Sequence, residues 1–279
     1  MKVRSRQLPP GWYPRGQAAV RAEIESMLAL EGQLPRMALA GIAPHAGWTF
    51  SGAVAAQVVA SLNPAVDTLA VVGGHLGVSA GILAAREEGY ETPLGACSAD
   101  LPLLDYLMRH LSVREDRYAD NTVEIQLPLI RHLLPEVQVL SLRAAPGAIA
   151  LELGESLAAA EKDLGRRIAV LGSTDLTHYG PNYGFMPHGR GKEAVRWVKE
   201  VNDRRIIDSL LALDLEEALQ RGVTEMSACS VGGAVAAAEF ARRKGAEEGK
   251  LLRYTTSYDL IPDDSFVGYA GIIYSRPGK

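Results

Sequence analysis

Short continuous runs of apolar residues recur along the chain and alternate with longer segments of helical spacing. The runs at residues 67–73 (DTLAVVG), 137–142 and 167–172 (RIAVLG) are typical of strands that are buried on both faces of a sheet. Further strands are predicted at the apolar start of residues 37–52 and at residues 81–86, 251–257 and 266–275. Most of these strands are followed by a turn containing glycine or proline.

The segments between the strands carry apolar residues at a spacing near 3.6, which predicts helices. They are residues 18–30, 53–62, 101–111, 120–134 and 148–164, with two or three more between 193 and 244. In residues 120–134, Asn121 followed by Glu124 forms a capping pattern, and Pro128 should bend the helix. The alternation predicts an α/β fold, a three-layer α/β/α sandwich around a mostly parallel or mixed sheet, in a single domain over residues 1–279.

Composition excludes several classes of protein. The 279 residues are 47% hydrophobic and 22% charged, with a formal charge of −4, which describes an ordinary globular protein without the basic surface of a nucleic-acid-binding protein. The N-terminus has no apolar signal region, and no apolar run reaches the roughly 18 residues of a membrane span. We therefore expect a cytoplasmic protein, and two cysteines suit a reducing compartment.

Three of the six histidines follow apolar strands directly and stand in turns near glycine: His45, His75 and His178. If these strands are neighbours, their turns meet in one crevice at the carboxyl edge of the sheet, where α/β proteins bind ligands. Imidazole is a good ligand for Zn, Cu, Fe and Ni, so the pattern predicts a metal site. The remaining three, His110, His132 and His188, are interpreted as surface or partly buried residues.

A metal site with two histidines usually has an anionic third ligand. The carboxylate candidates are Asp120, Asp175, Glu124, Asp263 and Asp264, and the thiol candidate is Cys229 at the start of a predicted helix, where the helix dipole lowers a thiol pKa. Spacing alone leaves this choice open.

Two other chemistries find little support. Ser173, Asp175 and His178 lie too close in one turn to form a catalytic triad, and no GxSxG motif is present. The pairs at residues 73–74 and 232–233 complete neither a GxGxxG motif nor a Walker loop, so nucleotide binding is not predicted.

Several ordered motifs resemble those of one known family. APHAGWTFSG (43–52), DNTVEIQLPLI (120–130) and STDLTHYG (173–180) resemble segments of the Memo-like family, also named AmmeMemoRadiSam system protein B. PPGWYP (9–14), Gly74-His75, TPLG (92–95) and Ala228-Cys229 fit further positions in order, so the resemblance spans nearly the whole chain. That family is similar in fold to the class III extradiol ring-cleaving dioxygenases, which bind a non-haem metal.

The resemblance implies roles for individual residues. It makes His45 and His75 metal ligands, and it puts Cys229 where the dioxygenases use a carboxylate. His178 takes the place of their acid/base histidine, with Asp175 beside it. Contacts to substrate are expected from the shared segments, at Trp48, Asp120, Asn121 and Tyr179.

Two departures from the family pattern bear on the substrate. Members often carry Glu-His where this chain has Asp120-Asn121, and a second histidine where it has Leu76. Each departure removes an imidazole, which affects substrate assignment more than metal binding.

Two imidazoles and a thiolate favour Fe, Zn or Cu over Mg or Ca, and the resemblance favours Fe(II). Three functions follow as hypotheses. The first is a metal-dependent, dioxygenase-like oxidoreductase acting on a small, for example aromatic, substrate; the second is a non-catalytic protein that binds a peptide or small ligand in the same crevice; the third is a metal-dependent hydrolase or lyase. The family name suggests a pathway link to a radical-SAM protein, and the sequence leaves the oligomeric state and catalysis itself open.

Overall fold

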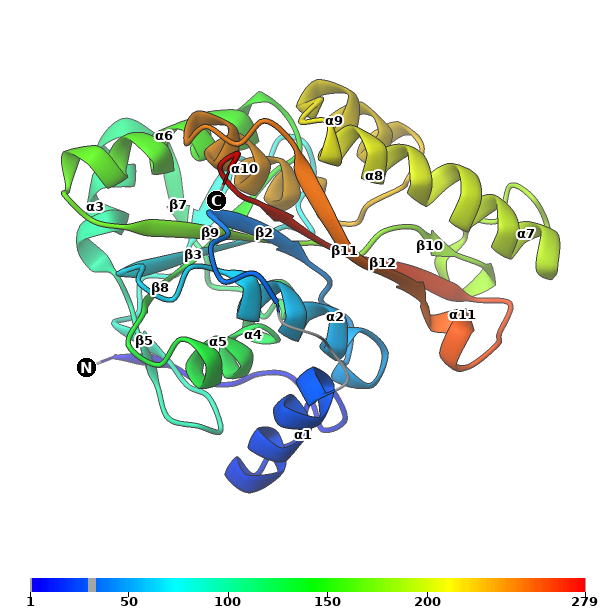
Figure 1. Ribbon diagram of the computed structural model, residues 1–279, viewed down its shortest axis with the longest axis horizontal. Helices are drawn as coiled ribbons and strands as arrows, with labels where there is room; N and C mark the ends of the chain where they lie inside the picture. Colours follow the sequence, from blue (N-terminus) through cyan, green and yellow to red (C-terminus); the bar gives the residue numbers. More distant parts are fainter. Residues whose placement is uncertain (1, 30–33, 279) are drawn as a thin grey trace.

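The computed structural model describes residues 2–29 and 34–278, and its centre is a mixed sheet of nine strands (Figure 1). Eight strands follow the order β10-β12-β2-β9-β3-β8-β4-β7, and β11 also pairs with β12. Their bounds are β2 (Ala40–Ala43), β3 (Thr68–Gly73), β4 (Ile82–Ala84), β7 (Val113–Glu115), β8 (Gln138–Ala144), β9 (Ile168–Ser173), β10 (His178–Tyr179), β11 (Gly249–Thr256) and β12 (Phe266–Tyr274).

The middle of the sheet is parallel and its flanks are partly antiparallel. Strands β2, β9, β3 and β8 run parallel, whereas β12 pairs antiparallel with β2 and β4 pairs antiparallel with β8. The register sets Ala43 opposite Ser173 and Val72 opposite Gly172, so the carboxyl ends of β2, β9 and β3 lie side by side. The predicted mixed sheet is therefore confirmed, as is the neighbourhood of the three strands that precede the histidines.

Helices cover both faces of this sheet, which confirms the three-layer α/β/α fold (Figure 1). One layer contains α1 (Gln17–Ala29), α2 (Trp48–Ser61), α4 (Asn121–Glu124) and α5 (Leu127–Leu133). The other contains α3 (Leu101–His110), α6 (Ala148–Asp163), α8 (Asp203–Leu211), α9 (Leu215–Thr224) and α10 (Val231–Arg243). Among the remaining described helices, α7 (Lys192–Trp197) joins α8 through a π-helical turn (Val198–Asn202), and α11 (Ser257–Leu260) precedes β12.

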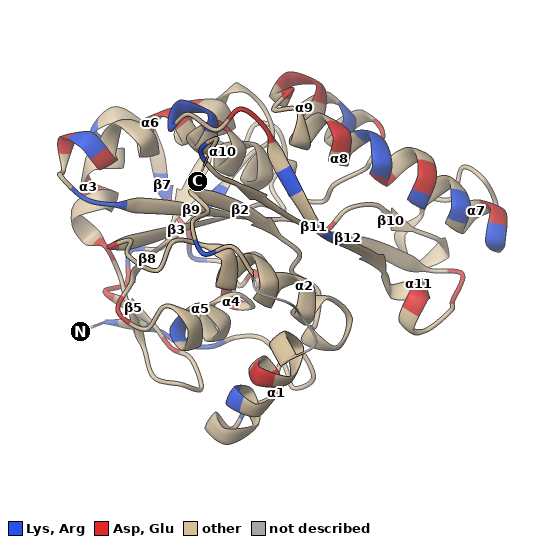
Figure 2. Ribbon diagram, viewed as in Figure 1, with Lys and Arg blue, Asp and Glu red and all other residues tan. Residues whose placement is uncertain are grey.

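Charge follows this layering. Lys, Arg, Asp and Glu gather on the outer helices α7, α8 and α9 (Figure 2), and strands β2, β3 and β9 contain none of these residues. Helices α2 and α10 are buried over most of their length because both are rich in alanine, glycine and valine. Within the described residues, no helix combines the length and the apolar character that crossing a membrane requires.

Helix α10 packs unusually close to the sheet through glycine. A Cβ atom at Gly233 would lie 2.2 Å from the carbonyl oxygen of Val72 in β3, and one at Gly172 would lie 2.6 Å from the carbonyl oxygen of Gly233. The backbones of helix and strands are thus in direct contact where the chain leaves Cys229.

The segment 120–134 differs from its prediction. It forms two short helices, α4 and α5, and Pro128 lies in the first turn of α5 instead of bending a continuous helix. The N-cap is Asp120, which is extended and accepts the backbone N–H of Thr122, so the expected cap at Asn121 is wrong. This shift releases the Asn121 side chain for another contact.

The N-terminal lead-in folds back onto the body. Tyr13 is buried with its ring 5.7 Å from that of Trp48, and the Trp48 backbone N–H donates to the carbonyl of Trp12. A second, small sheet not expected from the sequence joins β1 (Val3–Arg4) to β5 (Gly89–Tyr90) and β6 (Cys97–Ser98). Leu30, where the first predicted helix ends, lies outside the described residues.

Candidate metal centre

His45, His75 and Cys229 come together at the carboxyl edge of the sheet. One donor atom from each lies within 4.8 Å of the others, and Cys229 Sγ is 3.2 Å from His45 Nε2. Ligands about 2.0–2.3 Å from one ion are roughly 3–4 Å apart. The Cys229–His45 distance falls in this range, and the limit of 4.8 Å for the other donor pairs lies slightly beyond it. The fold thus brings together His45 and His75, which follow strands, and Cys229, one of several candidates for the third ligand.

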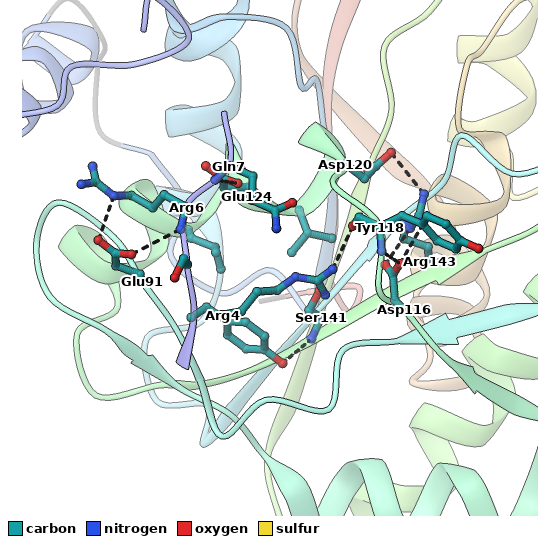
Figure 3. A pocket seen from close by; sticks show the side chains of 14 residues that line it. Arg4, Arg6, Gln7, Glu91, Asp116, Tyr118, Asp120, Glu124, Ser141 and Arg143 are labelled. Atoms are coloured by element: carbon teal, nitrogen blue, oxygen red, sulfur yellow. Dashed lines mark hydrogen bonds and ion pairs between the residues drawn. The ribbon is translucent and has the colours of Figure 1, made fainter. Parts of the chain in front are cut away.

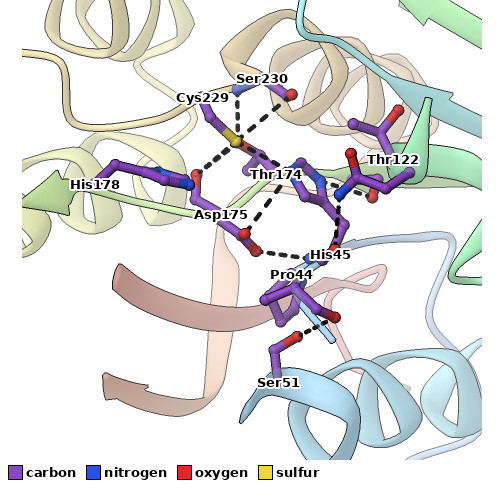
Figure 4. A network of polar contacts seen from close by, with 12 residues as sticks. Pro44, His45, Ser51, Thr122, Thr174, Asp175, His178, Cys229 and Ser230 are labelled. Carbon is purple, nitrogen blue, oxygen red and sulfur yellow. Dashed lines mark hydrogen bonds and ion pairs between the residues drawn. The ribbon is translucent and has the colours of Figure 1, made fainter. Parts of the chain in front are cut away.

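His45 is held in the turn after β2 by three hydrogen bonds (Figure 4). Its backbone N–H donates to Asp175 Oδ1 at 2.7 Å, its carbonyl accepts from Asn121 Nδ2 at 3.0 Å, and its Nδ1 lies 3.3 Å from Ser173 Oγ. Ser173 Oγ also accepts a hydrogen bond from Gln126 Nε2. Because Nδ1 is engaged by Ser173, Nε2 is the nitrogen that faces Cys229, and the ring is fixed for ligation.

His75 adopts a left-handed backbone conformation, with φ of 54°, in the turn after β3. Its N–H donates to Ser230 Oγ at 3.1 Å, and its Nδ1–H donates to Asp120 Oδ2 at 3.1 Å. A carboxylate on one imidazole nitrogen leaves the other as the metal donor. The Asp120 carboxylate is in turn 3.2 Å from Arg143, which also forms two 2.8 Å bonds to Asp116 (Figure 3).

We predict that Asp120→Asn weakens metal binding by about 10- to 100-fold, because an amide orients the His75 ring less strongly and lowers its basicity. The measurement is a competition titration of the metal against a chelator. Asp105→Asn, at an exposed position of α3, is the matched control and should bind as the wild type does. Unchanged affinity in Asp120→Asn would show that this carboxylate does not orient the ligand.

Cys229 ends the loop before α10. Its backbone N–H donates to the carbonyl of Asp175 at 3.2 Å, and its Sγ lies 3.8 Å from the hydroxyl of Thr174. Burial alone would raise the thiol pKa, but the imidazoles of His45, His75 and His178 hold it well below its usual value. The thiolate is the form that binds metal.

The histidine partners titrate in the opposite direction. Burial would lower the pKa of His75, yet the Asp120 carboxylate and the Cys229 thiolate raise it to about 10. Burial would lower that of His45 as well, and Cys229 and Asp175 raise it. The cluster therefore stabilises positive charge at its centre, where a divalent cation would replace the imidazole protons.

Two cavities open beside the cluster and share His75, His178 and Tyr183. They measure about 450 Å³ and about 540 Å³. His178 at the start of β10 places its Nδ1 3.1 Å from the carbonyl of Leu176, which can only accept, so Nδ1 carries the proton and Nε2 has a free lone pair. Its ring packs edge-on against Tyr183 at 4.9 Å.

Of the four residues expected to contact substrate, one lines a cavity and two are buried in the core. Asn121 lines the larger cavity, and Asp120 lies behind His75. Trp48 is 3% exposed and donates its indole N–H to the carbonyl of Ile125, while Tyr179 is fully buried and donates to the carbonyl of Gly189. Neither aromatic residue is among those that line the two cavities.

The other third-ligand candidates are engaged elsewhere. Asp175 is 3% exposed and, although its Oδ2 is 3.8 Å from His45 Nε2, it accepts the His45 backbone N–H. Glu124 accepts the backbone N–H groups of Gln7 and Leu8, Asp263 accepts that of Ser265, and Asp264 pairs with Arg190. Burial raises the pKa of Asp175 even though His45 acts in the opposite direction.

Sequence reasoning missed the residues that hold the cluster in place, namely Ser173, Ser230, Gln126, Arg143 and Asp116. One signal was present. Arg143 is the one charged residue of β8, and a buried guanidinium in a sheet requires carboxylate partners. Ser173 begins the family-like segment STDLTHYG, although the pattern assigns it no supporting role, and no comparable signal distinguishes Ser230 from other serines.

A buried carboxylate, Asp203, supports the turn that carries His178. Asp203 Oδ1 accepts the backbone N–H of Thr177 at 3.0 Å, and Oδ2 accepts the hydroxyl of Tyr254 at 2.8 Å. Asn202, at the end of the π-helical turn, donates to the Thr177 hydroxyl at 2.9 Å. Complete burial raises the pKa of Asp203 to about 6 despite these hydrogen bonds.

We predict a pH-dependent difference in stability between the wild type and Asp203→Asn. The folded wild type keeps its proton to about pH 6, whereas the unfolded chain loses it near pH 4, so the wild-type free energy of unfolding falls as pH rises through this window. The difference, wild type minus variant, should fall by about 2–3 kcal/mol between pH 4 and pH 6.5, measured by chemical denaturation. A flat difference would contradict the burial effect, and Asp208→Asn, exposed on the same helix, should show none.

The fold and the cluster place the chain among α/β sandwich proteins that gather two histidines and a cysteine at the carboxyl ends of parallel strands. A model of the Memo-like protein family matches residues 4–273, and the chain belongs to that family. It is 32% identical to a MEMO1 family protein of Pyrococcus abyssi, over 95% of this chain and 97% of that protein. It is likewise 32% identical to one of Methanothermobacter thermautotrophicus, over 96% and 99%.

The fold also resembles a solved structure of remote sequence. An uncharacterized protein of Escherichia coli K12 superposes with a TM-score of 0.53 at 14% identity, over 85% of this chain and 99% of that one. At this identity the similarity concerns the fold alone.

Proposed function

We propose that the protein is a non-haem metal-dependent oxidoreductase, similar to a dioxygenase, that acts on a small aromatic substrate. His45, His75 and Cys229 would hold a divalent metal, with Fe(II) favoured over Zn or Cu. The observation that carries this proposal is the convergence of the three donors within 4.8 Å beside an open crevice. A bound Fe(II) would supply the redox chemistry that couples dioxygen to an organic substrate.

The residues of the chain would provide binding and proton transfer. His178 Nε2, with Nδ1 fixed by Leu176, is oriented to accept a proton from a substrate hydroxyl. Tyr183, packed against His178, offers an aromatic surface at the junction of the two cavities. Asp175 acts through His45, whose backbone it anchors, so we assign it a positioning role.

The test is anaerobic reconstitution with Fe(II), followed by measurement of oxygen uptake over a panel of catechols. We expect uptake that matches substrate loss, and we expect His178→Gln to keep its iron while losing most of the uptake. His188→Gln, at an exposed position, is the matched control. Absence of uptake by fully loaded protein with every catechol would refute the oxidoreductase. Turnover supported by Zn without oxygen would favour a hydrolase or lyase, and ligand binding without turnover would favour a binding protein.

A further inference from the structure

The crevice beside the cluster has two halves of different character. We call the cavity of about 450 Å³ the apolar wing, because its wall includes Leu76, Val78, Pro146, Val223 and Met226. We call the cavity of about 540 Å³ the polar wing, because its wall adds the polar residues Asn121, Asn182, Ser257, Asp263 and Ser265 to the apolar residues Trp12, Phe50 and Ile261. The wings share His75, His178 and Tyr183, so a ligand at this junction can extend into both.

Among the described residues that line the two wings, the charged side chains include carboxylates but no lysine or arginine. The carboxylates are those of Asp175 and Asp263 in the polar wing. The Asp175 carboxylate is buried and bonded to the His45 backbone, which leaves Asp263 as the exposed charge. With His45 and His75 bound to a metal as neutral imidazoles, a substrate carboxylate or phosphate in the polar wing would therefore meet no cationic side chain.

Nearby basic residues are already paired. Arg190 lies 3.2 Å from Asp264, Lys199 pairs with Asp259, and Arg143 is 5% exposed behind His75 with Asp116 and Asp120. A ligand that recruited any of these cations would first have to break an ion pair. The electrostatics of the polar wing thus favour a neutral or positively charged group.

The apolar wing keeps large hydrophobic side chains in contact with solvent. Val78 is 66% exposed, Met226 52% and Val223 46%. Exposed apolar side chains gathered along a groove mark a ligand-binding surface more often than a plain surface. Methionine also adapts to ligands of irregular shape.

We propose that the substrates are aromatic diols with an amine-bearing or neutral polar substituent for the polar wing and apolar substituents for the apolar wing, and that the crevice discriminates against aromatic acids and phosphates. The diol part of this substrate rests on the proposed function, and its substituents are inferred from the residues that line the two wings. Any metal ion at the cluster attracts anions by itself. The ligands that are compared must therefore all contain the same metal-binding diol and differ only in their substituent.

The experiment uses three catechols of similar length: 4-(2-aminoethyl)catechol, 4-ethylcatechol and 3-(3,4-dihydroxyphenyl)propionate. Calorimetric titration into Zn-loaded protein measures binding without turnover. We expect the amine to bind about tenfold more tightly than the acid, because the Asp263 carboxylate attracts the ammonium group and repels the ligand carboxylate. The effect is modest because water partly screens both interactions. Equal binding, or tighter binding of the acid, overturns the inference.

Substitutions at Asp263 test whether this residue causes the preference for the amine over the acid. Asp263→Asn should bring the affinities of amine and acid together, and Asp263→Lys should reverse their order; an unchanged ratio in Asp263→Lys overturns the role of Asp263. Asp105→Asn, outside both wings, makes the same charge change and should keep the wild-type ratio. Met226→Gln should weaken binding of 4-tert-butylcatechol several-fold more than that of catechol, and equal losses overturn the role of the apolar wing.

The experiments distinguish failure of the proposed oxidoreductase function from failure of the inference about the substrate. If the catechols bind with the expected preference but no oxygen is consumed, the oxidoreductase is wrong and the substrate class stands. If no catechol binds, the amine-to-acid affinity ratio of 2-phenylethylamine and 3-phenylpropionate is measured in metal-free wild type relative to metal-free Asp263→Asn, which cancels the attraction of the charged His45 and His75 imidazoles for the acid. A ratio no higher in the wild type than in Asp263→Asn overturns the inference.

Discussion

Cys229→Ser should reduce the affinity for Fe(II) or Zn(II) by more than about 100-fold, beyond the loss typical of an outer partner of a metal ligand. Serine replaces an anionic donor with a neutral hydroxyl that stays protonated at pH 7, while both imidazoles keep their positions. The remaining two-histidine site would carry no negative charge among its ligands, and a divalent ion would lose its strongest electrostatic contact. Elemental analysis of protein purified without added metal should show the difference directly.

The other cysteine of this chain provides the control. Cys97 is 4% exposed and its Sγ lies 3.9 Å from the carbonyl of Leu127, in the layer of α5 and away from the cluster. Cys97→Ser should retain the wild-type metal content. Cobalt substitution adds a second readout, since the thiolate-to-metal absorption band should disappear only in Cys229→Ser. Equal metal in all three proteins would remove Cys229 from the ligand set.

Gly233→Ala should be among the most destabilising single-methyl additions in the chain, by about 3 kcal/mol or more in the free energy of unfolding. The new Cβ would lie 2.2 Å from the carbonyl oxygen of Val72 and close to that of Gly73, so backbone meets backbone and no side chain can rotate away. Helix α10 would have to lift from β3 and expose a buried face.

Chemical denaturation of the variant measures this cost. Gly16→Ala is the matched control because a Cβ there would meet nothing within 4 Å, and its stability should stay within about 0.5 kcal/mol of the wild type. Because Cys229 precedes α10, the lifted helix should also weaken metal binding. A variant as stable as the wild type would show that the helix–sheet distance adjusts freely.

The strand-end histidines could be predicted because each follows a continuous apolar run, and such runs report strands buried on both faces. His45 and His75 needed only the neighbourhood of β2, β9 and β3, which the sheet confirms. Cys229 could be proposed but not selected from the sequence, since its proximity depends on how α10 packs over the sheet. That packing is a long-range property without a local signal.

The incorrect predictions concern local features that contacts distant in sequence determine. The local pattern does not separate Asn121 from Asp120 as the cap, because asparagine and aspartate are nearly equivalent caps. The choice of Asp120 is coupled to His75 and Arg143, which are distant in sequence. The short strands β7 and β10 escaped prediction because three or two residues give no periodicity, and their pairing with β4 and β12 defines them. A proline inside a helical pattern predicts a bend, but Pro128 lies in the first turn of α5, a position to which proline is well suited.

The distance in sequence between the donors links the metal to folding. Cys229 and His45 are 184 residues apart, and the strands between them must be assembled before the two side chains can meet. A metal that binds only the assembled site stabilises the whole sheet by mass action, by about 4 kcal/mol at a thousand times the dissociation constant. Loss of α10 or of β2 would release the ion alike, so metal retention reports on the folding of segments from both halves of the chain.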